Sequence, residues 1–471
     1  MDLYREFMSK TFDLVPRKVP KVKTKYRRIV TEIPPAESIP LLKKLYQLEP
    51  FSMQGQPPII WDRAEGINVY DPYGNKFLDF SSGVLVANAG HGRHEIRKAI
   101  EKVLHKPLLH NYYFPSLERL KFAEKILSLL PKIANPNEYK VFLTTTGSEA
   151  IEVAIKLSRA YGQKISKEKG KKVGLVSFEG SFHGRTLGAQ MIGGMPKLKE
   201  WIPYLDPEIW QVPFPDGYRC EDVSFNLFLK TLEEKKVSPD RIAAVISETY
   251  QGGSAAFAPI EYMKNLRKWT EEHDILLVLD EIQAGFGRTG KMFGFEHYEI
   301  MPDIFVCGKG ITSSLPLSCV IGKKEIMDLF PPGTMSSTHL GNPVCISAAL
   351  ASIELIEKEN LVENSYKMGK ILHEELDKIK KAFSDVIGCI QGRGLVAGIH
   401  FATKDKEPLG DLAALVVRKC VEKGLLLFAP VGFGGATIKI NPPLIINEEP
   451  LLEGIEVFSE AIRESIEETR H

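Results

Sequence analysis

A lysine between two glycines, Lys309 in residues 306–310, is the first residue whose surroundings suggest chemistry. It follows the apolar residues 304–307, which are typical of a buried strand, and lysine is seldom placed at the buried end of a strand. A desolvated lysine near other positive groups has a lowered pKa and becomes a nucleophile that forms Schiff bases. Taken alone, the motif also fits a surface lysine in a turn.

An acid pair, Asp280 and Glu281, comes directly after a second apolar stretch, residues 275–279. A carboxylate at that position lies close to the interior, so it needs a partner. The partner is a backbone N–H or a buried basic residue if the acid is structural, and a protonated ring nitrogen if it is functional. An aspartate beside a pyridine nitrogen keeps that nitrogen protonated, which makes the ring an electron sink.

Two turns that open helices offer groups suited to a phosphate. Residues 145–150 contain Gly147 and Ser148, and the free backbone N–H groups and positive dipole end of a helix attract an anion. A turn of this composition also simply caps a helix. Thr338 stands where a later long helix opens, and its hydroxyl can reach a phosphate oxygen or act as part of a capping turn.

The loop of residues 181–186 gathers an aromatic ring, an imidazole and a guanidinium after another predicted strand. Phe182 can stack on a flat ring, with His183 beside it. Arg185 can clamp a carboxylate with two parallel hydrogen bonds, and we expect it to face a bound substrate. An ordinary polar loop is the alternative.

These residues depend on a series of apolar stretches that alternate with helical ones from about residue 95 onward. Such a rhythm predicts a mostly parallel α/β sheet that is covered on both faces. Ligands bind at the carboxyl ends of the strands in sheets of this kind, so the residues after each strand should meet. The predicted strands are 140–143, 173–178, 243–247, 275–279, 304–307 and 318–321, and predicted helices include 149–161 and 260–272.

Three parts of the chain are expected. Residues 1–94 form an N-terminal arm and short strands (59–61, 68–70 and 76–80, with turns at 64–66 and 71–75) that pack on the small domain. Residues 95–345 form a large cofactor-binding domain, and residues 346–471 form a small C-terminal domain that ends in a helix near 449–468. The basic stretch 17–28 is interpreted as a solvated, extended segment.

The overall composition narrows the class of protein. The 471 residues are 44% hydrophobic, and 61 Lys and Arg balance 60 Asp and Glu, which argues against a nucleic-acid-binding surface. The six cysteines form no CxxC pair, which indicates free thiols in a reducing compartment. No apolar run is long enough for a membrane span or a leader, so we expect a cytoplasmic protein without a membrane partner or a metal.

Taken together and in order, the motifs resemble those of the class III, or omega, aminotransferases, and the resemblance extends over residues 61–443. It implies a type I pyridoxal-phosphate transferase fold, with a mostly parallel central sheet in the large domain and a smaller α+β C-terminal domain. It also implies pyridoxal 5'-phosphate as cofactor and a homodimer with shared active sites, with higher oligomers left open. The motifs that carry the resemblance lie at residues 146–150, 182–185, 280–283, 308–311 and 338–343.

The resemblance also implies roles for individual residues. Lys309 is similar to the Schiff-base lysine that also transfers the proton, and Asp280 to the partner of the pyridine nitrogen. The other implied cofactor contacts are Gln283 at the ring hydroxyl, Phe182 stacked on the ring, His183 beside it, Gly147 and Ser148 at the phosphate, and Thr338 supplied by the other subunit. Val84 resembles a pocket-wall position.

The substrate is implied by the similarity to 4-aminobutyrate aminotransferases within this family. There the arginine that matches Arg185 holds the remote carboxylate of an omega-amino acid. A glutamate and an arginine that gate the acceptor's carboxylate in those enzymes are replaced here by Gly253 and Lys439. Lysine lacks the planar fork of arginine, so we expect looser acceptor choice, with pyruvate competing with 2-oxoglutarate.

Other activities remain open from the sequence. An amino-acid racemase or epimerase of the same family would share every cofactor residue and differ only after proton abstraction. A decarboxylating enzyme or an aminomutase is a further variant. A nucleotide-binding α/β protein would need GxGxxG after the first strand, and residues 144–150 do not supply it.

Overall fold

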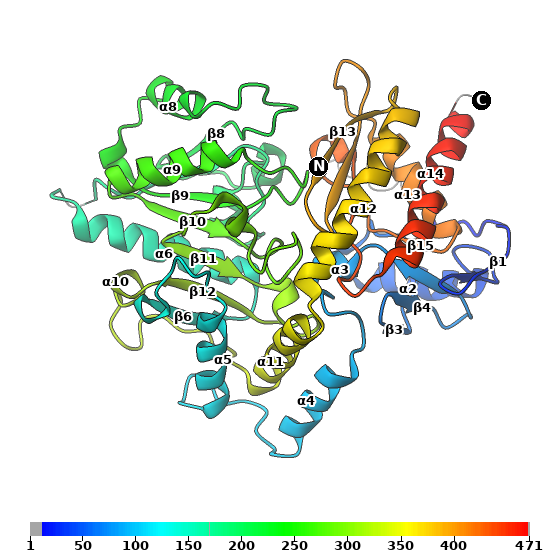
Figure 1. Cartoon of the computed structure of the whole chain (residues 1–471), viewed down its shortest axis with the longest axis horizontal. Helices are drawn as coiled ribbons and strands as arrows, with labels where there is room; N and C mark the ends of the chain where they lie inside the picture. The colour runs from blue at the N-terminus through cyan, green and yellow to red at the C-terminus, as the bar shows by residue number, and fades with distance from the viewer. Residues whose placement is uncertain (1–11, 169, 470–471) are drawn as a thin grey trace. The chain divides into compact units, whose positions relative to one another are not determined.

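The structure, a computed structural model, describes residues 12–168 and 170–469 of the chain (Figure 1). Its contacts divide the described residues into a central unit within residues 94–363 and a terminal unit that combines residues 12–93 with 364–469. None of the helices in the described part is long and apolar enough to cross a bilayer.

The described residues of the central unit form a 7-stranded sheet in the order β6-β12-β11-β10-β9-β7-β8. Only β12 runs antiparallel to its neighbours, which agrees with the predicted mostly parallel sheet. The strands are β6 (Tyr139–Thr144), β7 (Gly174–Phe178), β8 (Ile209–Val212), β9 (Ile242–Glu248), β10 (Leu276–Asp280), β11 (Ile304–Cys307) and β12 (Ser318–Lys323). The helices are α4 (His94–Leu104), α5 (Leu117–Ser128), α6 (Gly147–Ile165), α7 (Leu187–Ile192), α8 (Phe225–Glu234), α9 (Ile260–Glu272), α10 (Lys324–Met327) and α11 (Pro343–Lys358).

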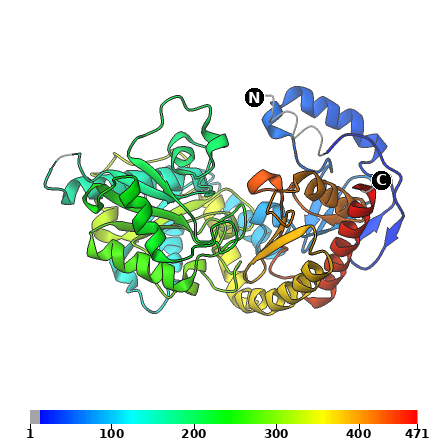
Figure 2. The same ribbon diagram turned by 90° about the horizontal axis from the view of Figure 1, so that it is seen from above.

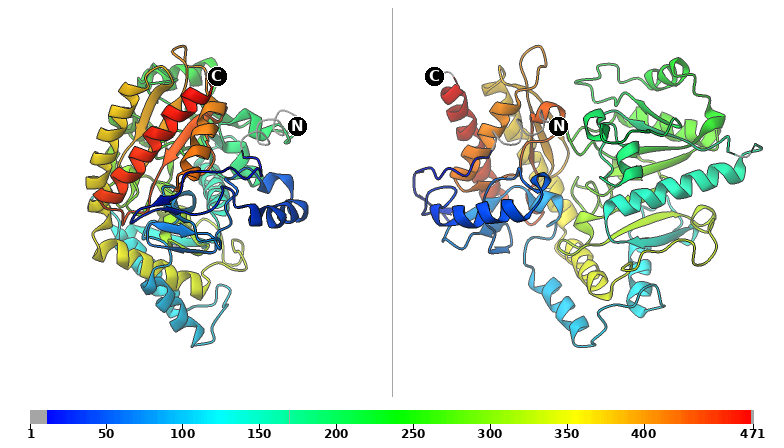
Figure 3. Two further views of the ribbon diagram at one scale, coloured as in Figure 1. Left: turned by 90° about the vertical axis from the view of Figure 1, so that its right-hand side faces the viewer. Right: turned by 180° about the vertical axis from the view of Figure 1, so that it is seen from behind.

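Helices cover both faces of this sheet because its strands are apolar on both sides. Ala154 and Leu157 of α6 pack in one core with Ile246 and Val306 of the strands. On the opposite face, the ring of Phe178 contacts aromatic rings from α8 and α9. Helix α9 lies in front of the sheet in Figure 1, and α6 lies in front of it when the sheet is seen from behind (Figure 3). The site must therefore lie at a strand end.

The carboxyl ends of five parallel strands meet at one edge of the sheet. β6, β7, β9, β10 and β11 run in the same direction, so their last residues and the loops that follow them are neighbours. Every predicted cofactor residue except Thr338 lies within or directly after one of these strands.

The terminal unit joins the two ends of the chain. A 6-stranded sheet has the order β1-β2-β5-β4-β3 with β15 beside β5, and a 3-stranded sheet has the order β13-β14-β16. Helices α13 and α14 lie side by side (orange and red in Figure 3). The strands are β1 (Val22–Lys23), β2 (Arg28–Ile29), β3 (Arg63–Glu65), β4 (Asn68–Tyr70), β5 (Lys76–Asp79), β13 (Ile387–Gly392), β14 (Ala397–Phe401), β15 (Leu425–Leu426) and β16 (Thr437–Ile440). The helices are α2 (Ile39–Leu48), α3 (Ser82–Leu85), α12 (Leu361–Ala382), α13 (Gly410–Glu422) and α14 (Glu448–Thr469).

The basic segment of residues 17–28 is partly neutralised by α14. Arg27 Nε lies 2.6 Å from Glu453 Oε1, and Lys25 Nζ lies 2.9 Å from Glu449 Oε2. The segment therefore lies on its own unit as an extended, paired stretch. Helix α2, blue in Figure 2, is set apart from the strands of this unit.

The structure differs from the sequence expectations at several places. Residues 59–61 form no strand, because Pro57 and Pro58 precede them and Trp61 is exposed, whereas the expected turn at 64–66 contains most of β3. Strand β8 was not predicted. The expected boundary at 345–346 lies instead at 363–364, since α11 packs against α4 and α5.

Candidate active site

Lys309 follows β11 at the first position of a short 3-10 turn. Its backbone φ is +45°, a strained value for a residue with a side chain, and such strain is common at functional sites. Lys309 as a residue is partly buried, and its ammonium group makes no hydrogen bond or ion pair within the described residues. Desolvation lowers the pKa of Lys309 to about 8, although the charges of Asp280 and Glu248 oppose this shift. A lysine in this state is ready to act as a nucleophile or base near neutral pH.

Asp280, the last residue of β10, is buried and bonded on both carboxylate oxygens. Its Oδ2 lies 2.9 Å from His183 Nδ1, and its Oδ1 accepts the Ile282 N–H at 3.0 Å. Burial by itself would lower the pKa of His183, but the bond to Asp280 outweighs burial, so this pKa is raised above its usual value. An imidazole N–H that donates to Asp280 stabilises the ionised carboxylate in the interior.

Glu248 ends β9 and is paired in register with Asp280 of the neighbouring strand. The side chain is buried, and its two oxygens accept the Phe182 N–H at 2.9 Å and the Gly252 N–H at 2.8 Å. Burial raises the pKa of Glu248 to about 7, an effect that His183 opposes and Asp280 reinforces. Sequence reasoning assigned no role to Glu248. Its place at the end of an apolar strand, like that of Asp280, was the available signal.

Two buried polar atoms at this edge have no partner within the described residues, His183 Nε2 and Gln283 Oε1. Unpaired buried polar atoms are rare in folded proteins and often point to a ligand. The turn after β9 approaches Gln283 closely, since a Cβ at Gly252 would lie 2.5 Å from Gln283 Nε2. The site therefore contains hydrogen-bonding capacity that the chain itself does not use.

The start of α6 supplies backbone donors at the same edge. Thr146 caps this helix, and its Oγ1 accepts the Glu149 N–H, so the N–H groups of Gly147 and Ser148 precede the helical hydrogen-bond ladder. The loop after β7 packs tightly against Ser148, because a Cβ at Gly184 would lie 2.1 Å from Ser148 Oγ. A helix start with free N–H groups is suited to a phosphate.

Phe182 and Arg185 leave the loop after β7 together. The Arg185 guanidinium lies 5.6 Å from the centre of the Phe182 ring, and the Arg185 N–H donates to Ser148 Oγ at 3.3 Å. Phe182 is half-buried, whereas Arg185 is exposed to solvent in the single chain. The substrate contact of Arg185 therefore remains a prediction.

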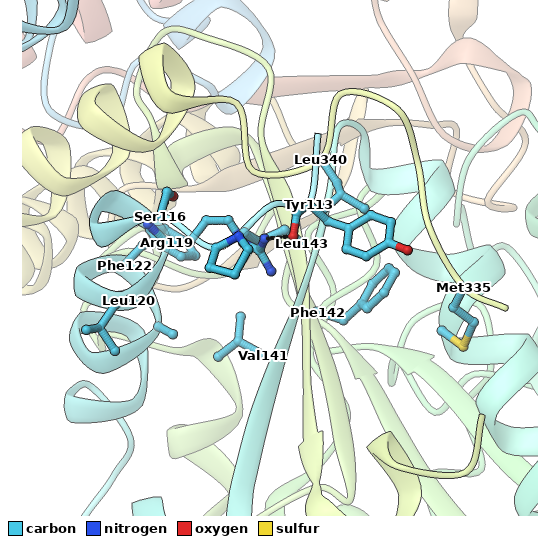
Figure 4. Close-up of a pocket in the computed structure, with 12 residues that line it drawn as sticks. Tyr113, Ser116, Arg119, Leu120, Phe122, Val141, Phe142, Leu143, Met335 and Leu340 are labelled. Carbon is cyan, nitrogen blue, oxygen red and sulfur yellow. Dashed lines mark hydrogen bonds between the residues drawn. The ribbon is translucent and has the colours of Figure 1, made fainter. Parts of the chain in front are cut away.

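Thr338 is exposed in the turn before α11. The neighbouring Ser337 hydroxyl donates to Glu149 Oε1 at 3.4 Å, which brings this turn to the start of α6. A pocket of about 390 Å³ lies beside the same turn, where Tyr113 lies next to Leu340 and Met335 lies on the side away from α5 (Figure 4). None of the predicted site residues lines this pocket.

The remaining predicted substrate residues are divided between the units. Gly253 follows Gly252 in the central unit. Val84 and Lys439 belong to the terminal unit, where Val84 is exposed on α3 with φ of +63° and Lys439 is buried in β16 beside Gly398. The structure therefore brings together the predicted cofactor residues of the central unit, and Val84 and Lys439 remain predicted substrate contacts.

Comparison with known proteins gives the family. The sequence profile described as Aminotransferase class-III matches residues 51–462. The chain belongs to the class-III aminotransferases. This confirms the family that the motifs indicated, the type I fold and pyridoxal 5'-phosphate as the cofactor of the enzyme.

The relatives of this aminotransferase-family chain are named for two kinds of activity, racemisation and amino transfer. It is 35% identical over 429 residues to the leucine/methionine racemase of Thermococcus litoralis, with 88% of the chain and 92% of the relative covered. It is 32% identical over 418 residues to a probable 4-aminobutyrate aminotransferase of Bacillus subtilis, with coverage of 85% and 92%. A solved Bacillus anthracis aminotransferase matches with a TM-score of 0.80 at 32% identity, covering 91% of this chain and 99% of that one.

The edge of the central sheet fits pyridoxal phosphate. A lysine with a lowered pKa, a buried carboxylate, a helix start with free N–H groups and two unused buried polar atoms lie within one group of loops. These are the groups that an amine-reactive carbonyl, a pyridine nitrogen, a phosphate and a ring hydroxyl require.

Proposed function

We propose that this enzyme transfers the amino group of an omega-amino acid, such as 4-aminobutyrate, to a small keto acid, either 2-oxoglutarate or pyruvate. The observation that carries the proposal is Arg185, whose guanidinium lies over the Phe182 ring at 5.6 Å and whose N–H is tied to Ser148. An arginine held at the rim of the cofactor site can bind a carboxylate that is remote from the reacting amine.

Lys309 is the residue proposed to attach the cofactor and to move the proton. When bound, pyridoxal phosphate supplies the electron sink that allows a C–H bond next to the substrate nitrogen to break. With a pKa of about 8, Lys309 is close enough to neutrality to accept and return that proton at physiological pH. Its neighbours Gly308 and Gly310 have no side chains to obstruct the movement.

The other cofactor contacts are proposed from the same edge of the sheet. Asp280, supported by His183, would keep the ring nitrogen protonated, and the oxygen of Gln283 would accept from the ring hydroxyl. Phe182 would stack on the ring, and the N–H groups of Gly147 and Ser148 would hold the phosphate.

We extend the proposal to a homodimer in which Thr338 reaches the phosphate bound by the other subunit. The described central unit exposes large apolar side chains near the pocket of Figure 4, namely Phe114 at 72%, Leu117 at 67% and Leu120 at 54%. An apolar surface of this kind is typical of a subunit interface. We place the enzyme in the cytoplasm, because its six cysteines form no disulfide.

For the substrate contacts, we propose that Val84 forms part of the pocket wall and that Lys439 meets the acceptor carboxylate. A lysine is a point charge and Gly253 offers no acid to gate it, so acceptor choice should be loose. Pyruvate should then compete with 2-oxoglutarate.

The test is a panel of amine donors against both keto acids, measured by keto-acid and amino-acid product analysis. We expect omega-amino acids to be converted by the wild-type enzyme. Arg185→Ala should raise KM for omega-amino acids at least about tenfold, the value of a charge-assisted hydrogen bond, and leave simple amines little changed. Equal losses for both kinds of donor would contradict the role of Arg185.

A second candidate is an amino-acid racemase, which is favoured by the 35% identity to a leucine/methionine racemase. The cofactor residues would act in the same way, but the proton would return to the same carbon from the opposite side. Incubation of single L-amino acids without a keto acid distinguishes the two. If the D-enantiomer appears with no net loss of amino acid, the enzyme is a racemase and the proposed transamination is wrong.

A further inference from the structure

Glu248 connects two loops at the cofactor edge by a single side chain. One carboxylate oxygen accepts the Phe182 N–H and the other accepts the Gly252 N–H, at 2.9 and 2.8 Å. The first bond holds the loop after β7 and the second holds the turn after β9. Because each bond uses a different oxygen, only an ionised carboxylate can accept both fully.

Each of the two loops contacts another member of the proposed site. His183, next to Phe182, is bonded to Asp280, and Gly252 lies against the side chain of Gln283. Glu248 itself is buried, and both of its oxygens are occupied by backbone N–H groups. Each oxygen of this buried side chain therefore already accepts one hydrogen bond from the backbone.

We propose that Glu248 is a positioning residue, which holds Phe182 and His183 against the cofactor ring by clamping the loop after β7 to the turn after β9. The inference rests on the proposed function for the assignment of Phe182, His183 and Gln283. It assigns to Glu248 a role in orientation, distinct from that of Asp280 on the neighbouring strand.

The clamp should weaken in mild acid. Burial raises the pKa of Glu248 to about 7, and the titratable groups whose charges act with it are His183, Asp280, Lys309 and Tyr250. Above that pH the carboxylate accepts two N–H groups. Below it, the protonated oxygen becomes a donor and a much poorer acceptor, so one of the two bonds is weakened.

The clamp is tested by Glu248→Gln and Glu248→Asp, with Glu299→Gln as control. Glu299 is a surface residue whose carboxylate pairs with Lys264 at 2.6 Å. An amide offers one acceptor oxygen, and aspartate is one methylene shorter, so each variant should retain only one of the two bonds. Amide hydrogen exchange of the cofactor-free protein, followed by mass spectrometry, reports the Phe182 and Gly252 N–H groups directly.

We expect exchange in the peptides that contain Phe182 and Gly252 to accelerate at least about tenfold in both Glu248 variants. In wild type, the protection of these peptides, corrected for intrinsic exchange, should increase between pH 6 and 8. The cofactor-loaded Glu248→Gln enzyme should lose visible circular dichroism and roughly tenfold to hundredfold in kcat, with KM within about twofold. Glu299→Gln should match wild type in each measurement.

The clamp would be overturned if both peptides of a folded Glu248 variant exchanged at the wild-type rate. Unchanged circular dichroism and kcat in that variant would overturn it as well. If Glu248→Gln does not fold, Glu248→Asp decides by the same measurements. Failure of the proposed function is distinguishable, because it would appear as a wild-type enzyme without amino transfer, while the exchange measurement on cofactor-free protein is unaffected.

Discussion

Replacement of Asp280 by asparagine removes one buried negative charge and preserves the shape of the side chain. The amide oxygen can still accept the Ile282 N–H that Oδ1 accepts at 3.0 Å, so the start of the following turn should remain in place. What is lost is the ionised partner of His183 Nδ1 at 2.9 Å and the negative charge proposed to hold a proton on the ring nitrogen.

The magnitude follows from the burial of this pair. Breaking a buried charged pair costs about 3–5 kcal/mol. If the charge acts in the rate-limiting step, this corresponds to a loss of roughly 10²- to 10⁴-fold in kcat at about 1.4 kcal/mol per factor of ten. The pKa of His183 should also fall, because burial, which lowers it, remains while the bond to Asp280 is lost.

The assay combines single-turnover kinetics on rapid mixing with an NMR titration of labelled histidine, assigned with a His183→Gln variant. Asp328→Asn, on an exposed carboxylate that pairs with Lys140, serves as the control and should leave both quantities unchanged. A rate within about tenfold of wild type, or an unchanged His183 pKa, would refute the proposed role of Asp280.

Three further predictions follow from the site. Lys309→Ala should abolish visible cofactor absorbance and turnover even at saturating cofactor, and continued turnover would contradict the attachment. In the cofactor-free protein, Lys309→Met should stabilise the fold by ~2 kcal/mol below pH 8, after allowance for partial exposure, as measured by urea unfolding. The pKa of Lys309 in the folded protein lies below the unfolded value of 10.5, so the free energy of unfolding of wild type should rise between pH 8 and 10.5. The extra stability of Lys309→Met should therefore shrink over this range and vanish by pH 10.5. Sedimentation should show a dimer, and mixing inactive Lys309→Ala with weakened Thr338→Ala subunits should yield mixed dimers with one wild-type-like site. Unrecovered activity in proven mixed dimers would indicate that Thr338 serves its own subunit.

Much of the central unit could be predicted from sequence because buried strands and amphipathic helices leave local patterns. Strand β11 and helix α9 have the predicted bounds, and β9 and β10 differ by about one residue at each end. Lys309 and Asp280 were identifiable because polar residues at the ends of apolar strands are unusual, and parallel strands bring such ends together. The family and the cofactor could be predicted from the order of these motifs.

Only the tertiary structure decided which of these residues touch. The His183–Asp280 bond joins loops from strands that are not neighbours in the sheet, and no local pattern records that contact. Helix α11 belongs to the central unit because of its packing on α4 and α5, although the sequence pattern places it after a plausible boundary. The role of Glu248 depends on two backbone N–H groups, and since every residue except proline carries such a group, the side-chain sequence cannot indicate which two it will bind.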